Sequence, residues 1–157
     1  MNINRNDIAS MQQRLTEYLT DQNLRKTTER YTILECICTI KGHFDVEMLQ
    51  KMLDGANFHV SRATIYNTIE LLVNASLVVR HQFSSQIVQY ELKCISETHH
   101  HLVCTHCGAV CEIKNKELAT LMNGRRFPKF SAEYYSLYIY GICSKCKFKL
   151  RQKKNNK

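Results

Sequence analysis

One short stretch of the chain concentrates side chains that bind metal ions. Residues 97–113, with the sequence ETHHHLVCTHCGAVCEI, hold four histidines, three cysteines and two glutamates in 17 positions. Thiolates, imidazoles and carboxylates are the ligands that zinc and first-row transition metals take from proteins. The chemistry to expect here is metal binding, and the spacing of these residues must indicate how many ions are bound.

Four cysteines form two pairs with the spacing of a zinc site. Two residues separate Cys104 from Cys107 and Cys143 from Cys146, and Gly108 follows the first pair. This spacing lets both thiolates reach one ion from a tight turn, and two such turns supply the four sulfurs of a tetrahedral zinc site. We predict a structural zinc ion at Cys104, Cys107, Cys143 and Cys146. A redox-active pair of dithiols is the alternative.

The histidines suggest a second site with different ligands. His99 and His101 are two residues apart, so on an extended segment both side chains point to one face and His100 points to the other. These two histidines lie close in sequence to Glu97, Glu112 and the first cysteine pair, and they are therefore candidate metal ligands.

The other four cysteines carry weaker signals. Cys36 and Cys38 lie in an apolar helical segment and are expected in the core. Cys111 lies in a predicted strand and is expected to be packed. Cys94 is close to the histidines in the sequence and is a candidate soft ligand or thiol sensor.

Length and composition indicate a globular chain with a core. Its 157 residues, 44% of them apolar, suffice for one medium or two small domains. No apolar run is long enough to cross a membrane, and the polar start MNINRNDIAS is not a secretory signal. We therefore expect a cytoplasmic protein, in which eight cysteines point to metal or redox chemistry rather than a disulfide framework.

The net charge of +8 is distributed unevenly. Residues 1–84 hold nine basic and nine acidic residues, so the whole excess lies in 85–157, with seven basic residues in 145–157. This basic end predicts either a solvated, disordered terminus or a nonspecific contact with nucleic-acid phosphates. Charge alone does not identify a DNA-binding protein.

The first half predicts helices followed by a hairpin. Apolar periodicity indicates helices over 7–20, 28–40, 46–55 and 62–74. Asp45 and Ser61 are the expected N-caps of the third and fourth. The segments LVVRHQF and IVQYELK, on either side of Ser84-Ser85-Gln86, predict a β-hairpin. This is the pattern of a winged helix-turn-helix domain, which we place at 1–84.

The second half predicts a mixed domain. Short strands at LVC (102–104) and VCEI (110–113) flank the first cysteine pair, a helix is expected over 114–123, and the Tyr- and Ile-rich segment 134–143 reads as a strand. The predicted fold class is α+β. The winged domain is followed by a metal-binding α/β domain at 85–150 and a basic, disordered tail at 151–157.

These parts, in this order, resemble the ferric uptake regulator (Fur) family over nearly the whole chain. The matching stretches are LRKTTER (24–30), SRATIYNTIELLVNASLV (61–78), YEL (90–92), HHHLVCTHCGAVCEI (99–113), SLYIYGIC (136–143) and CSKC (143–146). The resemblance implies a homodimeric, metal-dependent transcription factor. In such a protein, the C-terminal α/β domain would be the dimerisation domain.

The resemblance also implies a regulatory metal site at the hinge between the domains. The matching positions are His43, Glu91, His99, His101 and Glu112. Imidazoles with carboxylates suit Fe(II), Mn(II) or Zn(II), and this mixed set allows metal exchange better than four thiolates do.

An accessory site found in many members of the family is not matched well here. Its positions fall near Thr98, His100, Ala119 and Tyr135, of which only His100 binds metal readily. We therefore expect two metal ions per chain, with His100, His106 and Cys111 as bystanders.

For DNA, the resemblance implies that the helix at 62–74 enters the major groove. Tyr66 would pack against thymine methyl groups, although helical spacing alone would place it in the core. Arg25 would reach an A·T-rich minor groove, and Arg30 would contact a phosphate. The implied DNA-binding residues are Arg25, Arg30, Ser61, Arg62, Thr64, Tyr66 and Asn67.

The implied function is metal-dependent repression. The homodimer would bind an A/T-rich palindromic operator when the regulatory site is filled, with iron as the expected signal. Regulation of zinc uptake or of the peroxide response remains open. Asn67 fits the peroxide-sensing members, but those usually have Asp where this chain has Glu91 and Glu112. Rivals from other classes are a zinc-dependent hydrolase and a zinc-ribbon interaction module; we expect no enzyme and no membrane partner.

Overall fold

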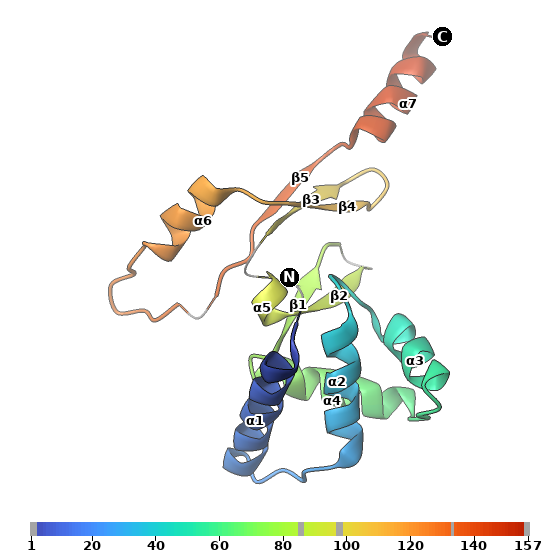
Figure 1. Ribbon diagram of the computed structural model, residues 1–157. Helices are drawn as coiled ribbons and strands as arrows, with labels where there is room; N and C mark the ends of the chain where they lie inside the picture. Colours follow the sequence, from blue (N-terminus) through green and yellow to red (C-terminus); the bar gives the residue numbers. More distant parts are fainter. Residues whose placement is uncertain (1–2, 85–86, 97–98, 133, 156–157) are drawn as a thin grey trace. The chain divides into compact units, whose positions relative to one another are not determined.

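The computed structural model describes residues 3–84, 87–96, 99–132 and 134–155 (Figure 1). The chain forms two compact units. The first consists of Met1–His81 and Val88–Ile95, and the second of Gln82–Ile87 and Ser96–Lys157. Within the described ranges, no helix has both the length and the apolar character that crossing a bilayer requires.

Four long helices, a two-stranded hairpin and a short fifth helix make up the first unit. In chain order, its elements are α1 (Arg5–Asp21), α2 (Thr28–Thr39), α3 (Val46–Gly55), α4 (Arg62–Asn74), β1 (Val78–Gln82), β2 (Val88–Leu92) and α5 (Lys93–Ser96). The α1 helix starts before the predicted 7–20 because Asn4 and Asp7 form a capping box. Both predicted N-caps are present: Asp45 accepts from the Met48 amide at 2.7 Å and Ser61 from the Thr64 amide at 3.1 Å.

The helices of the first unit enclose one apolar core. Leu15, Leu34, Leu49, Ile65 and Leu72 contribute to it and are each 0% exposed. Along α1, for example, Met11, Leu15 and Leu19 are buried at intervals of four residues, so the helix turns one apolar stripe inward.

The hairpin of the first unit pairs with a residue from the loop after α2. Phe44 and Tyr90 form an antiparallel bridge, with N···O distances of 2.8 and 2.7 Å in its two backbone hydrogen bonds. This bridge brings the residue before Phe44, His43, beside the residue after Tyr90, Glu91.

A three-stranded sheet forms the centre of the second unit. Its elements are β3 (His100–Cys104), β4 (Val110–Ile113), α6 (Lys116–Asn123), β5 (Tyr138–Gly141) and α7 (Ser144–Asn155). The strand order is β4-β3-β5, with β3 antiparallel to β4 and parallel to β5. The parallel return to β5 requires a long crossover, which contains α6.

The two units divide the chain differently from the predicted domains. The boundary expected after residue 84 is replaced by an exchange of segments: Val88–Ile95 groups with the first unit because β2 pairs with β1, while Gln82–Ile87 groups with the second. Of the predicted turn, Ser85 and Gln86 lie outside the described residues.

In the segment predicted to be a disordered tail, 151–157, the structure continues α7 to Asn155. The Lys147 amide donates to the Cys143 carbonyl at 2.9 Å, so the helix starts within the second cysteine pair. Lysine, arginine, glutamine and leucine are good helix formers and continue it. Residues 156–157 lie outside the described part.

Candidate functional site

The two cysteine pairs meet in the second unit. One sulfur from each of Cys104, Cys107, Cys143 and Cys146 lies within 4.8 Å of the others. The Cys107 and Cys143 sulfurs are 3.9 Å apart, close to the edge of about 3.8 Å for a tetrahedron with Zn–S bonds of about 2.3 Å. Gly108 closes the first turn at φ 73°, a conformation that glycine adopts without strain. The four sulfurs fit one zinc ion, as predicted.

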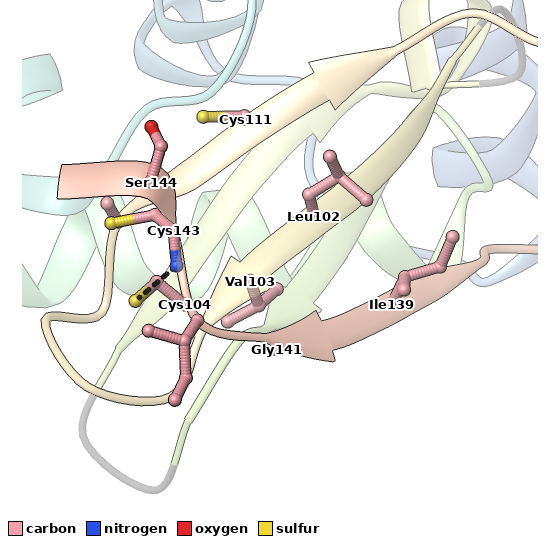
Figure 2. A pocket seen from close by; sticks show the side chains of 10 residues that line it. Leu102, Val103, Cys104, Cys111, Ile139, Gly141, Cys143 and Ser144 are labelled. Atoms are coloured by element: carbon pink, nitrogen blue, oxygen red, sulfur yellow. Dashed lines mark hydrogen bonds between the residues drawn. The ribbon is translucent and has the colours of Figure 1, made fainter. Parts of the chain in front are cut away.

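Backbone amides stabilise negative charge in this cluster. The Cys143 amide donates to the Cys104 sulfur at 3.3 Å (Figure 2). This hydrogen bond, helped by the amides of Cys107 and His106, lowers the pKa of Cys104 to about 6. Hydrogen bonding with the Cys107 and Cys143 sulfurs raises the pKa of Cys146 to about 12. Because cysteine binds zinc as a thiolate, the amide hydrogen bonds at Cys104 favour the form that binds metal.

The predicted histidine pair of the second unit also lies together. The Nε2 atoms of His99 and His101 are 3.1 Å apart, and His99 Nε2 is 3.9 Å from a carboxylate oxygen of Glu112. The strand register accounts for this, since His101 on β3 lies opposite Glu112 on β4. Both imidazoles are buried, at 4% and 1% exposure. Three of the five predicted regulatory ligands thus form one group within this unit.

His100 faces away from this group, as the alternation along a strand predicts. Its ring centroid lies 5.9 Å from that of Tyr135. Both positions match the accessory site of the resemblance, and of the two only His100 binds metal readily. Thr98, another of these positions, lies outside the described residues.

The remaining two predicted ligands meet in the first unit, together with a third residue. His43 Nε2 lies 3.5 Å from Glu91 Oε2, and His81 Nε2 lies 3.4 Å from the same oxygen. The rings of His43 and His81 pack edge to face, 5.2 Å apart. His81 and Glu91 are both 0% exposed.

His81 is not among the metal ligands predicted from the sequence. Its signal was available: along β1, His81 and Val79 are buried while Arg80 and Gln82 are exposed. An imidazole on the buried face of a strand is unusual enough to be a candidate ligand.

The other cysteines divide between buried and exposed. Cys38 is buried, and burial raises its pKa to about 12; burial also raises the pKa of the half-buried Cys36. Cys94 is half-buried against the core of the first unit, and no metal-capable group found among the described residues includes it. The expectation that Cys111 is packed is wrong, because β4 is an edge strand and this side chain is exposed.

The exposed face of the sheet is apolar. Leu102, Cys111 and Ile139 lie in register across the three strands and are all solvent-exposed. They line a pocket of about 370 Å³ that also contacts Cys104 and Cys143 (Figure 2). An open apolar row of this kind on a small sheet suits contact with another protein surface.

In the first unit, α4 presents a polar face to solvent. Its inner face is formed by Ile65, Ile69 and Leu72, whereas Tyr66 is 50% exposed. The placement of Tyr66 in the core, which helical spacing alone suggested, is therefore wrong. Of the other residues predicted to bind DNA, Arg25, Ser61, Arg62 and Asn67 are exposed, and Thr64 and Arg30 are half-buried. The Ser61 and Thr64 hydroxyls lie 2.9 Å apart, and Arg30 donates to the Arg25 carbonyl.

Comparisons with known proteins agree with these features. Residues 21–140 match the model of the Ferric uptake regulator family. The Ferric uptake regulation protein of Neisseria meningitidis is 32% identical over 138 residues, covering 83% of this chain and 92% of that protein. The Peroxide operon regulator of Bacillus subtilis is 25% identical, covering 83% and 89%.

Among solved structures, the Ferric uptake regulator from Pseudomonas aeruginosa with manganese superposes with a TM-score of 0.68. It is 28% identical, and the match covers 82% of this chain and 97% of that one. The likeness therefore extends over both units and is not limited to a common winged-helix domain. The chain belongs to the ferric uptake regulator family and is a metal-responsive transcriptional regulator rather than an enzyme.

Proposed function

We propose that this regulator is a repressor of the iron-sensing type. It binds an A/T-rich palindromic DNA operator as a homodimer when its regulatory site holds a divalent metal. Its location in the cell is the cytoplasm. The observation that carries the proposal is the presence of two histidine–carboxylate groups, one around the buried Glu91 in the unit that contains α4 and one around the buried His99 and His101 in the other unit. Mixed nitrogen and oxygen ligands suit Fe(II), Mn(II) or Zn(II).

The five side chains His43, Glu91, His99, His101 and Glu112 bind one regulatory ion in this proposal. Two belong to the first unit and three to the second. By holding one ion together, these residues tie the unit that contains α4 to the unit that carries the zinc cluster. Without the ion that restraint is lost, and apparent DNA affinity falls with the fraction of molecules in the competent arrangement. The four-cysteine cluster keeps its zinc in both states and has a structural role.

A second copy of the chain covers the apolar row of Leu102, Cys111 and Ile139 in this proposal. The described part of the second unit buries few large apolar side chains, chiefly Phe83 and Val103. Domains with cores this small usually depend on metal or on association. A dimer also presents two copies of α4, as a palindrome requires.

DNA is read mainly by α4. Arg62, Tyr66 and Asn67 lie on its exposed side, where they can reach base edges or phosphates. Arg25 and Arg30 would contact the backbone or minor groove. The basic face of α7, including Lys145 and Lys149, adds a nonspecific phosphate contact whose strength falls with salt.

Replacing Tyr66 with alanine should lower operator affinity by about 1–3 kcal/mol, the usual cost of losing one good base contact. Folding should be nearly unchanged because the ring is half exposed. Fluorescence anisotropy on an operator and on a scrambled duplex measures the effect, with Asn74→Ala as an exposed control on the same helix. An equal loss on both duplexes would argue against base reading by Tyr66.

The proposal as a whole is tested by titrating the protein onto an A/T-rich inverted repeat at fixed salt. Anaerobic Fe(II), Mn(II) and Zn(II) are added separately. A steep rise in affinity with micromolar Fe(II) or Mn(II) is expected. A rise only with trace Zn(II) would make the chain a zinc-uptake regulator, and loss of Fe(II)-dependent binding after peroxide would make it a peroxide sensor.

A further inference from the structure

We propose that His81 is a ligand of the regulatory metal, so that the first unit supplies three donors, His43, His81 and Glu91. This extends the function proposed above, in which only His43 and Glu91 come from this unit. The inference rests on positions within the first unit alone.

The first argument is burial. Both carboxylate oxygens of Glu91 are buried, and the residue is 0% exposed, as is His81. A carboxylate in such a place is costly unless positive charge lies beside it. Two imidazoles approach one oxygen of this carboxylate, and a divalent cation among them would compensate the charge fully.

The second argument is distance. Nitrogen and oxygen donors about 2.1 Å from a tetrahedral ion lie about 3.4 Å apart, and in an octahedral site about 3.0 Å. The Nε2 atoms of His81 and His43 lie 3.4 and 3.5 Å from Glu91 Oε2, which matches the tetrahedral spacing. N–H···O hydrogen bonds are usually about 2.7–3.2 Å long.

A third histidine in the same unit shows the contrast. His59 Nδ1 lies 2.9 Å from Asp54 Oδ1, with the two side chains 74% and 46% exposed. That pair has the length and exposure of an ordinary surface hydrogen bond. His81 and His43 instead direct Nε2 atoms to one oxygen from two different segments, as ligands of one ion do.

The fold accounts for this convergence. The bridge between Phe44 and Tyr90 places His43 beside Glu91, and the pairing of β1 with β2 brings His81 to the same place. Two imidazoles and one carboxylate form a donor set that binds Fe(II), Mn(II) or Zn(II) while leaving positions for further ligands.

The test is a nuclear magnetic resonance measurement on the full-length protein with its structural zinc in place. Cadmium-113 is added to protein labelled with nitrogen-15 histidine, and scalar coupling to cadmium identifies each imidazole nitrogen bonded to the ion. His43→Gln, His81→Gln and His59→Gln assign the three resonances, and the last of these variants is the matched control. We expect cadmium splitting at Nε2 of both His43 and His81, and none at His59.

Affinity provides a second readout. His81→Gln should bind cadmium or Mn(II) at least about 10-fold more weakly by chelator competition, and His59→Gln should not differ from the native chain. Splitting at His43 without splitting at His81 would overturn this inference and leave the proposed function intact. Splitting at neither residue would overturn both. The coupling is measured on the native chain, so the result does not depend on whether His81→Gln folds.

Discussion

Replacing His101 with alanine is expected to abolish the increase in DNA affinity that metal produces, a loss of about 10- to 100-fold at saturating Fe(II) or Mn(II). The Nε2 atom of His101 lies 3.1 Å from that of His99, and His101 on β3 is paired with Glu112 on the neighbouring strand β4. Removing this imidazole takes a central donor from the second unit's group. The variant should then bind DNA with the weak affinity of the metal-free protein, measured by anisotropy at fixed salt.

His101 also packs on Tyr138, with ring centroids 5.4 Å apart, so alanine would leave a cavity. His101→Gln, which fills more of that space, separates loss of a ligand from loss of packing. His99→Ala should behave like His101→Ala. His106→Ala, which removes an exposed imidazole from the same unit, should retain the full metal response. Full metal-dependent binding by the His101 variants, with normal zinc content, would contradict the proposed regulatory site.

Replacing Cys104 with serine is expected to unfold the second unit and to abolish the dimer. Structural zinc sites of this kind contribute on the order of 10 kcal/mol near neutral pH, comparable with the whole stability of a small domain, about 5–15 kcal/mol. The described part of the second unit has few large buried apolar side chains to offset that loss. Cys143→Ser should have the same effect, because its sulfur faces that of Cys107 from the other pair.

The variant is expected to lose its zinc and to lose the dimer peak in gel filtration. In a thermal melt, the second unit should unfold at a lower temperature than it does in the native chain. The first unit should keep its own transition because its core is formed by four helices. His106→Ala is the control: it removes an exposed side chain from within the first cysteine pair without removing a sulfur, and it should alter stability by less than about 0.5 kcal/mol. A Cys104→Ser protein that stays folded and dimeric without zinc would show that the cluster is not structural.

Much of the metal chemistry can be predicted from local spacing. Two residues between cysteines determine that each pair can share an ion, and one residue between His99 and His101 places both on one face of a strand. The caps of α3 and α4 are equally local, since Asp45 and Ser61 bond to amides three residues later. These features depend on contacts within one turn or one strand, so a linear pattern contains them.

Other features depend on which segments meet. Phe44 pairs with Tyr90, and this register between distant segments brings His43 and His81 to Glu91. Helical spacing alone wrongly suggested the core for Tyr66, and the strand pattern wrongly placed Cys111 in the interior. The sequence by itself determined the ligand types, their pairing within each motif and the positions of the helices in the first unit. Only the tertiary structure decided that His81 joins the first group and that the face of the sheet with Leu102 and Ile139 is open, because strand register and coverage depend on residues far apart in the chain.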